Sequence, residues 1–582
     1  MTWWMAQRRR MFAGVLLVVA SSLPAAAQDQ RRGSYTPPVA ATIHAVTAEH
    51  GMVVAQEKIA AHIGVDVLRR GGNAVDAAVA TGFAMAVTYP RAGNLGGGGF
   101  MIIHSKERGE DVAIDYRETA PAATTPDIFL GADGKPDIAK SRDSALGIGV
   151  PGTVAGLALA LEKYGSGQFT LADLLQPTID LARGGIVIAD DSADTLPDWH
   201  RRMARWPSSK IFSRADGSSL REGDTLVQPD LAATLARIAE HGPRGFYQGP
   251  VAERLASAVR DAGGIMTADD LKSYQAIIRA PVRGSYRGYD IVSMPEPSSG
   301  GVVLLETLNI LEGFPMGEMK QGSAASLHVM IEAMKRAYAD RARYLGDPAF
   351  ATAPVATLIS KDYAARQRAG IDLDRATPWA DALSAKPPRE GDNTTHFSVV
   401  DSRGNAVSNT YTLNYSYGLG LVAEGTGVLL NNELDDFTAA PGAANVYGLV
   451  GFEANLPGPG KRPLSSMSPT IVLKDGKPVL ITGSPGGSRI ISSVLQVVVN
   501  VLDYGMDVTA AVAAPRLHHQ WLPDEVRVEQ GFAADTLAAL RAKGHRVIEP
   551  LGQTSVNSIM VTAHGLSGAP DPRTRGAEAA GQ

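Results

Sequence analysis

Residues 392–401 read Asp-Asn-Thr-Thr-His-Phe-Ser-Val-Val-Asp, a polar approach that leads directly into a Thr-Thr pair and a strand-like run. A threonine inside a chain is a weak nucleophile, because no neighbouring group need accept its proton. A threonine that begins a chain carries its own base, since its α-amino group, with a pKa of about 7.7–8.0, can accept the hydroxyl proton near neutral pH. Cleavage between Asn393 and Thr394 would create such a residue. By themselves, the two threonines fit the start of an ordinary strand better.

The composition is that of a large globular protein. Hydrophobic residues make up 45% of the 582 residues and charged residues 20%, as is usual for soluble proteins. There is no cysteine, which excludes disulfides, a thiol nucleophile and thiolate metal sites. The net charge is −5, and residues 1–27 contribute three Arg and no acid, so the chain without them carries −8. This acidic balance argues against nucleic acid as a partner.

The N-terminus has the three parts of a secretory signal peptide. A basic cluster, Arg8–Arg10, precedes an apolar run over residues 11–23, and Ala25-Ala26-Ala27 supplies a small-residue cleavage site. The sequence therefore predicts that residues 1–27 are removed and that the mature chain starts at Gln28. The apolar run is too short to span a membrane comfortably, and no other run in the sequence is long enough. We therefore expect a periplasmic or secreted protein without a membrane span in its mature form.

The chain before residue 394 is expected to be mainly helical, with a short β segment. Apolar residues recur at helical spacing in the first part, and a glycine-rich stretch at 93–99 separates it from the β segment. The elements expected here are two helices over 56–87, divided at Gly71–Asn73, strands at 100–104 and 112–116, mostly helix over 150–350, and an exposed loop over 365–393.

From Thr394 onward the pattern is that of β-structure. Two strand-like runs flank Asp401-Ser-Arg-Gly-Asn405, which is a hairpin turn signal. We therefore expect strands at 396–400 and 406–411.

A glycine turn at 483–487, Gly-Ser-Pro-Gly-Gly, joins an apolar strand at 478–482 to a helix at 488–502. Such a turn directs backbone N–H groups to one spot, which suits a phosphate or an oxyanion. The lysine of a P-loop is missing, which disfavours the phosphate. Considered alone, a tight turn that needs positive φ is the better interpretation.

The acidic stretch 431–437, Asn-Asn-Glu-Leu-Asp-Asp-Phe, follows an apolar strand at 427–430. It could bind a cation or an ammonium group, or form a solvated turn. A calcium loop would need more oxygen ligands at alternating positions, whereas the spacing alone also admits a glycosidase carboxylate pair.

Other polar residues have two interpretations each. Arg117 could recognise a carboxylate through two hydrogen bonds or pair with Glu118 or another acid. The serine pair between Pro463 and Pro469 could present hydroxyls to a ligand or satisfy its own loop. His518-His519 is interpreted as structural or surface histidine rather than a metal site.

Taken together, these segments resemble the γ-glutamyltranspeptidases, which are N-terminal nucleophile hydrolases. The resemblance runs over nearly the whole mature chain and is densest between 394 and 525. It is carried by the glycine run 96–99, Asp115-Tyr-Arg-Glu-Thr-Ala-Pro121, Thr394-Thr-His-Phe-Ser-Val-Val-Asp401, Tyr411-Thr-Leu-Asn414, residues 429–437, Pro463-Leu-Ser-Ser-Met-Ser-Pro-Thr470 and Gly483-Ser-Pro-Gly-Gly-Ser-Arg489.

The resemblance implies an α+β fold, the four-layer αββα sandwich of the N-terminal nucleophile hydrolases, built from two subunits cut from one precursor. The cut would lie between Asn393 and Thr394. It would give a large subunit of residues 28–393 and a small subunit of residues 394–582, interleaved in one fold as a heterodimer.

The resemblance also implies the roles of individual residues. Thr394 would be the nucleophile of both processing and catalysis, with Thr412 hydrogen-bonded to its hydroxyl, and Gly486 and Gly487 would form the oxyanion hole. The α-carboxylate of a γ-glutamyl substrate would be held by Arg117, Ser465 and Ser466, its α-ammonium by Asn414, Glu433 and Asp436, and Tyr447 would belong to a lid loop over 441–452. No metal and no organic cofactor is implied.

The implied reaction is a two-step acyl transfer. Thr394 would attack the γ-glutamyl amide of glutathione or a related compound, and water, an amino acid or a dipeptide would then take the γ-glutamyl group. A rival is a glutaryl-cephalosporin acylase of the same architecture, which would have no use for Asp436 because glutaryl lacks the ammonium group. A second rival is a periplasmic protein that binds glutamyl peptides without turnover and stays one chain.

Overall fold

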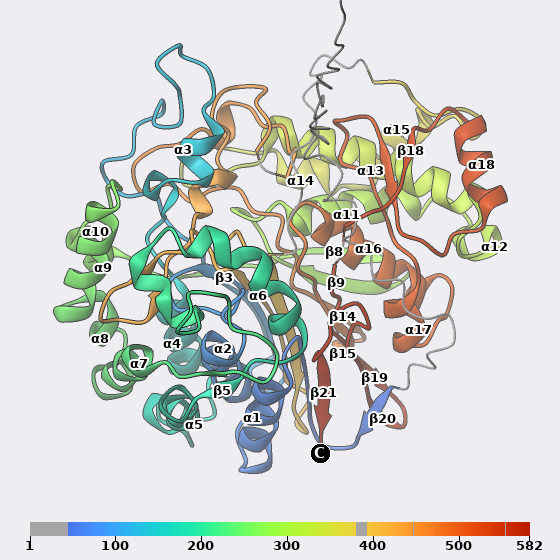
Figure 1. The fold of residues 1–582 in the computed structure, drawn as a ribbon. Helices are drawn as coiled ribbons and strands as arrows, with labels where there is room; N and C mark the ends of the chain where they lie inside the picture. The colour runs from blue at the N-terminus through green and yellow to red at the C-terminus, as the bar shows by residue number, and fades with distance from the viewer. Residues whose placement is uncertain (1–44, 380–392, 446, 553) are drawn as a thin grey trace, which may run out of the picture.

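Two antiparallel sheets of seven strands face each other, and helices cover the outer face of each (Figure 1). The computed structural model describes residues 45–379, 393–445, 447–552 and 554–582. Separate apolar cores lie between each sheet and its helices, and a third core lies between the two sheets. The chain is therefore a four-layer αββα sandwich, as predicted.

The first sheet contains the predicted nucleophile strand at its centre. Its strands, in spatial order, are β21 (Glu578–Gly581), β2 (Met52–Ala55), β10 (Thr394–Val400), β11 (Ala406–Thr412), β3 (Gly98–Ser105), β4 (Glu110–Tyr116) and β7 (Ile277–Arg279). The second sheet has the order β1 (Val46–Ala48), β20 (Gly565–Ala569), β19 (Ser558–Thr562), β15 (Lys477–Thr482), β14 (Thr470–Lys474), β9 (Tyr289–Ser293) and β8 (Val282–Tyr286). Each sheet combines strands from both sides of residue 394, so the two parts of the chain are interleaved.

Side chains of β10 alternate between two cores, as the period of a strand requires. Phe397 and Val399 lie in the core beneath the helices of the first sheet, whereas Val400 lies in the core between the sheets. Thr394 is an even number of residues from Val400, so its side chain lies on the same face of the strand and points into the space between the sheets. The strand begins at Thr394 itself, two residues earlier than predicted, and pairs with β11 in the register Thr394↔Thr412.

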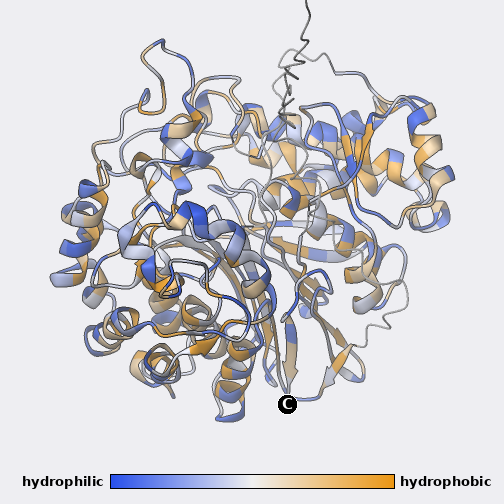
Figure 2. Cartoon of the chain, in the orientation of Figure 1, coloured by the Kyte–Doolittle hydropathy of each residue, from blue (hydrophilic) through white to orange (hydrophobic). Residues whose placement is uncertain are grey.

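Helices of the first sheet's outer layer come from the N-terminal part of the chain. Its α2 is buried at every position, as predicted from its apolar sequence, and contacts β10 and β11. Figure 2 shows apolar residues concentrated in the strands and on the helix faces turned toward them. This layer contains α1 (Lys58–Arg69), α2 (Ala74–Thr88), α4 (Thr153–Tyr164), α5 (Leu171–Gly184) and α7 (Pro229–His241).

The second sheet is covered by helices from both parts of the chain. These are α11 (Gly300–Leu311), α13 (Ala324–Tyr344), α16 (Arg489–Leu502) and α17 (Val508–Ala513). Shorter or peripheral helices are α3 (Ile138–Arg142), α6 (Asp190–Met203), α8 (Arg244–Tyr247), α9 (Pro250–Asp261), α10 (Ala268–Ser273), α12 (Met316–Met319), α14 (Val355–Leu358), α15 (Lys361–Ala369) and α18 (Ala534–Ala542). Small ribbons are β5 (Ile186–Val187) with β6 (Thr225–Leu226), β12 (Val422–Ala423) with β13 (Val428–Leu429), and β16 (Leu517–His518) with β17 (Val526–Val528) and β18 (Val547–Ile548).

Two boundaries differ from the sequence-based expectation. The region 150–350 is largely helical but also contains β7, β8 and β9, whose mixed polar and apolar residues gave no helical or strict alternating period. The loop expected over 365–393 starts too early, because α15 continues to Ala369. Residues 380–392 and the predicted signal peptide lie outside the described residues. None of the described helices combines the length and apolar character needed to cross a membrane.

Candidate active site

The hydroxyl of Thr394 lies at the open end of the central β hairpin, where β10 begins and β11 ends. Its Oγ1 donates to Thr412 Oγ1 at 3.3 Å. Thr412 Oγ1 in turn donates to the carbonyl oxygen of Asn393 at 2.9 Å and accepts from the Asn414 N–H at 2.9 Å. A hydrogen bond to a carbonyl oxygen stabilises the negative charge that develops there when the carbonyl carbon is attacked. The residues therefore bring a hydroxyl and a polarised carbonyl together across the Asn393–Thr394 bond.

The side chain of Asn393 is also held in place. Its Oδ1 accepts a hydrogen bond from Ser416 Oγ at 2.7 Å, and Ser416 Oγ accepts from Arg91 Nε at 3.0 Å. Arg91 is itself paired with Asp191 at the start of α6. The residue before the predicted cut is thus anchored through its side chain as well as its carbonyl.

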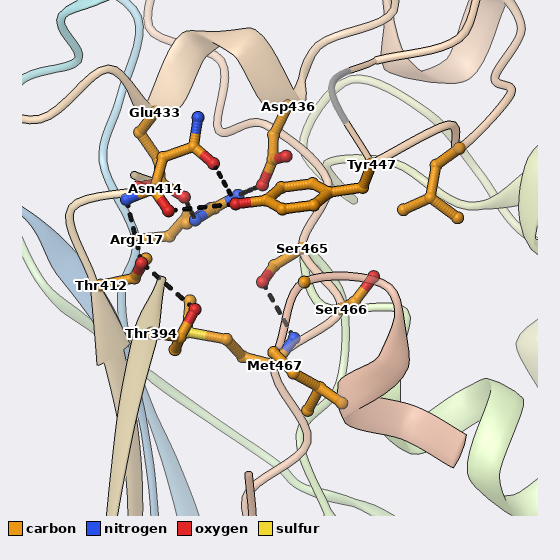
Figure 3. Close-up of a pocket in the computed structure, with 13 residues that line it drawn as sticks. Arg117, Thr394, Thr412, Asn414, Glu433, Asp436, Tyr447, Ser465, Ser466 and Met467 are labelled. Atoms are coloured by element: carbon orange, nitrogen blue, oxygen red, sulfur yellow. Dashed lines mark hydrogen bonds and ion pairs between the residues drawn. The ribbon is translucent and has the colours of Figure 1, made fainter. Parts of the chain in front are cut away.

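A pocket opens beside Thr394 (Figure 3). Nine of its lining residues were predicted from the sequence as substrate-binding, catalytic or lid residues, and Gly487 of the glycine turn is a tenth. The full lining is Arg117, Thr394, Thr412, Asn414, Glu433, Asp436, Tyr447, Leu449, Ser465, Ser466, Met467, Gly487 and Ile490. The fold therefore brings the predicted site together from segments more than 300 residues apart, and Gly486 is the only member of that predicted set outside the lining.

Charged groups in the pocket form one cluster around Arg117. Its guanidinium is fully buried and pairs with Glu433 and, at 2.5 Å, with Asp436 Oδ2. Its Nε donates to the Pro463 carbonyl oxygen at 3.1 Å. The family resemblance implied that Arg117 and the two acids bind opposite charges of a ligand, whereas here they pair with one another directly. Of the two interpretations of Arg117, pairing with acids is confirmed, although its main partners are Glu433 and Asp436 rather than Glu118.

The acids of this cluster sit in an environment that disfavours their charge. Burial raises the pKa of Glu433 and of Asp436, and Arg117 opposes the rise in both. The two residues are the first and last of a 3-10 turn, Glu433–Asp436. The sequence of this segment also admits a solvated turn as one interpretation. That alternative is wrong for Glu433, which is 1% exposed.

Tyr447 covers one side of the pocket. Its hydroxyl donates to Asn414 Oδ1 at 2.8 Å, as Figure 3 shows, and its ring lies so close to Gly487 that a Cβ there would be 2.5 Å from Cδ1. The described part of the segment 441–452 also reaches Asp436 through Asn445 Nδ2 at 3.2 Å. Through Asn445 and Tyr447, this segment thus contacts both the acidic turn and the glycine turn.

The glycine turn needs its glycines for two reasons. Gly486 and Gly487 have φ of 126° and 57°, values that favour glycine, and the turn leads directly into α16. Gly483 packs against the His396 ring, where a Cβ would lie 2.3 Å from Cε1. The tight-turn interpretation is therefore correct, and Gly487 also lines the pocket.

Some residues at the site were not predicted. Met467, Leu449 and Ile490 line the pocket as apolar walls; Met467 lies inside a quoted motif and Leu449 inside the predicted lid loop, but neither was assigned a role. His518 and His519 are both buried, so of the two interpretations the structural one is correct. Among the described residues no group of three or more His, Asp or Glu is arranged to hold a metal ion.

Comparisons with known proteins agree with this geometry. The sequence profile of the family Gamma-glutamyltranspeptidase matches residues 60–581. The chain is 53% identical to a glutathione hydrolase proenzyme of Escherichia coli (strain K12), over 91% of this chain and 92% of that one. It is 48% identical to a glutathione hydrolase proenzyme of Pseudomonas sp. (strain A14), again over 91% and 92%. Among solved structures, a cephalosporin acylase from Bacillus halodurans superposes with a TM-score of 0.81 at 27% identity, covering 93% of this chain and 97% of that one.

The buried carboxyl of Glu118 generates a pH prediction. Neither of its oxygens has a hydrogen bond to another described residue, and Arg117 Nη1 is 3.8 Å away. Burial raises the pKa of Glu118 to about 7. Between about pH 4.5 and 7 the folded state therefore holds a proton that the unfolded state has lost, so the free energy of unfolding falls as pH rises through this window.

We expect Glu118→Gln to remove part of this fall, because glutamine cannot ionise. Thermal unfolding of the wild type and the variant from pH 4.5 to 8 measures the difference. The variant should gain melting temperature relative to the wild type as pH increases. A constant difference across this range would contradict the account of Glu118.

Proposed function

The chain belongs to the γ-glutamyltranspeptidase family, and we propose that it cleaves γ-glutamyl amides by transferring the acyl group through an ester on Thr394. The observation that carries the proposal is a nucleophile candidate at the head of β10 beside a pocket that offers both a buried cation and buried acids. Glutathione, named in the relatives' glutathione hydrolase activity, is the proposed substrate.

The active form is proposed to arise by cleavage between Asn393 and Thr394. Thr394 Oγ1 attacks the Asn393 carbonyl carbon, the peptide C–N bond breaks, and water hydrolyses the resulting ester. The products are a large subunit, 28–393, and a small subunit, 394–582, that remain together as a heterodimer because both sheets contain strands of each. The hydrogen bond from Thr412 to the Asn393 carbonyl supports this reaction, and relatives described as proenzymes are consistent with it.

Export is part of the same proposal. Removal of residues 1–27 as a signal peptide would deliver the chain to the periplasm or the outside of the cell. The basic, apolar and small-residue order of that segment supports this route.

In catalysis, the free α-amine of Thr394 serves as the base. It accepts the proton of Oγ1 while Oγ1 attacks the γ-glutamyl carbonyl carbon. The N–H groups of Gly486 and Gly487 stabilise the tetrahedral oxyanion. The C–N bond then breaks, and the leaving amine takes the proton from the Thr394 ammonium. Water, an amino acid or a dipeptide attacks the ester in the second step and releases Thr394. This sequence needs no metal or organic cofactor.

The γ-glutamyl head is proposed to bind as a zwitterion. Arg117, Ser465 and Ser466 hold its α-carboxylate, and Asn414, Glu433 and Asp436 hold its α-ammonium. Such a ligand presents an anion to Arg117 and a cation to the acids, so it exchanges existing ion pairs for new ones rather than burying unpaired charge. Tyr447 shields the pocket from solvent above Gly487.

The glutaryl acylase remains the rival with the same chemistry. It is disfavoured by identity, which is 53% and 48% to the two glutathione hydrolases against 37% to the Acylase ACY 1 proenzymes of two Pseudomonas strains and 27% to the cephalosporin acylase. It is also disfavoured by Asp436 and Glu433, since a glutaryl group has no ammonium to pair with them. A binding protein without turnover would need neither the glycine turn at the pocket nor cleavage at Thr394.

We expect Thr394→Ala to give an uncleaved, inactive chain, because both processing and catalysis lose their nucleophile. Denaturing electrophoresis and intact mass measure cleavage, and γ-glutamyl-anilide measures activity. Thr395→Ala is the matched control, since Thr395 lies one residue along on the opposite face of β10 and its hydroxyl has no hydrogen-bond partner in the described structure. The control should be cleaved and active. A Thr394→Ala protein that is still cut at this bond would overturn the assignment.

Asp436→Asn is expected to weaken binding of γ-glutamyl substrates by at least about 2 kcal/mol, the order for a buried charge left unpaired. This corresponds to a roughly thirtyfold higher KM for γ-glutamyl-anilide. The preference for γ-glutamyl-anilide over glutaryl-anilide should shrink, because glutaryl-anilide lacks the ammonium group. An unchanged KM for γ-glutamyl-anilide would refute the role of Asp436.

A further inference from the structure

Arg341, on α13, is a buried cation next to the pocket that the lining itself does not include. Its Nε donates to Ser299 Oγ at 2.9 Å, and its Nη2 donates to Ser466 Oγ at 3.3 Å. No ion pair within 4 Å joins Arg341 to an acid in the part of the chain that the structure describes. A buried arginine without a carboxylate partner is costly, so its position calls for a compensating anion.

The contacts of Arg341 determine which way a pocket hydroxyl can donate. Arginine has only donors, so Ser466 Oγ must accept from Arg341 and its own hydrogen points elsewhere. Ser465 Oγ likewise accepts from the Met467 N–H at 3.1 Å, as Figure 3 shows. In the described structure neither hydroxyl donates to another protein group. Both serines line the pocket, so both are left free to donate to an anion in it.

The same arginine is joined to the other serine through the backbone. Ser299 Oγ accepts from Arg341 and donates to the Ser465 carbonyl oxygen at 2.6 Å, and the Ser299 N–H donates to that oxygen at 2.8 Å. Arg341 therefore contacts Ser466 directly and is linked to Ser465 through Ser299. It thus connects the loop between Pro463 and Pro469, which carries both serines, to α13 and to the start of α11.

Arg341 also balances the charge of the pocket. Arg117 faces three buried acids, Glu433, Asp436 and, at 3.8 Å, Glu118. Burial raises the pKa of Asp436, and Arg341 acts against that rise after Arg117. Burial lowers the pKa of Arg341 to about 10, so it remains charged at neutral pH. With Arg341 included, two cations lie among these three acids, and a zwitterionic head adds no net charge.

We propose that Arg341 is a positioning residue for the substrate's α-carboxylate, which directs the Ser466 hydroxyl toward the pocket and supplies a second positive charge behind it. This inference rests on the proposed function, because it assigns Arg341 to the carboxylate end of the γ-glutamyl head. Different residues then recognise the two charged groups of the head. Asp436 binds the ammonium, and Arg341 acts on the carboxylate through Ser466.

The test compares two anilides that differ only in the carboxylate. γ-Glutamyl-anilide carries it, and 4-aminobutyryl-anilide does not, while both keep the amino group and the scissile amide. The ratio of their kcat/KM values measures how strongly the enzyme reads the carboxylate. Arg341→Gln should lower this ratio by at least about tenfold, the order for a lost charge-assisted hydrogen bond, and should change kcat/KM for 4-aminobutyryl-anilide by no more than about twofold.

A double-mutant cycle tests whether Arg341 acts through Ser466. Ser466→Ala should also lower the ratio, and the double variant should lose less than the product of the two single losses. Losses that multiply fully would overturn the action through Ser466. An equal loss for both anilides in Arg341→Gln would show a merely structural role and would also overturn the proposal.

The control is Arg336→Gln, which removes another buried arginine of α13 that pairs with Glu332 and the Gly370 carbonyl instead. It should leave the ratio unchanged. If Arg341→Gln does not fold or process, Arg341→Lys takes its place, since lysine keeps the charge but cannot make both hydrogen bonds. A loss confined to γ-glutamyl-anilide supports the proposal, and an unchanged ratio overturns it. A wild-type protein inactive on γ-glutamyl-anilide would instead refute the proposed function itself.

Discussion

The register in which β10 pairs with β11 is the constraint on which the rest of the site depends. Thr394 lies opposite Thr412, and the next six pairs continue without a bulge to Val400 and Ala406. A slip of one residue would turn Thr394 into the helix-covered core and bring Thr395 toward the second sheet. The same slip would move the side chains of Phe397 and Val399 out of the helix-covered core and into the space between the sheets. Burial of these two side chains therefore opposes it. Burial of ordinary apolar side chains thus holds a reactive hydroxyl in place.

The second sheet supplies the glycine turn, which contacts β10 of the first sheet. His396 lies in β10, two residues after Thr394, and packs on Gly483, where β15 turns toward α16. Burial lowers the pKa of His396 to about 3, so it is neutral, and its ring nitrogens are occupied by Thr410 and Ser398. We interpret it as a spacer between the nucleophile strand and the glycine turn. The charged cluster lies on the other side of Thr394, where buried acids and arginines are retained at a cost in stability. Strongly perturbed, buried charges of this kind are typical of sites built for binding.

Much of this was predictable from the sequence, and the failures have identifiable causes. The strand beginning near Thr394, the glycine turn and the acidic turn each have local signals, and the resemblance joined them into one site. The pairing of Arg117 with Glu433 and Asp436 was not foreseen, because the local sequence shows charges but not which of them meet after folding. The role of Arg341 could not be predicted, because a charged residue in a helix is usually expected to face solvent. β8 and β9 were missed because their alternation is broken by Gly284 and by the turn at Arg287.

The central claim is that this pocket reads both charges of a γ-glutamyl head and passes its acyl group to Thr394. The most direct measurement compares aniline release from γ-glutamyl-anilide and from glutaryl-anilide by the purified wild-type protein. The account predicts turnover of the γ-glutamyl compound with little or none of the glutaryl compound, because Asp436 and Glu433 require the ammonium group. Preference for glutaryl-anilide would contradict the claim, and would leave the Thr394 chemistry in an acylase.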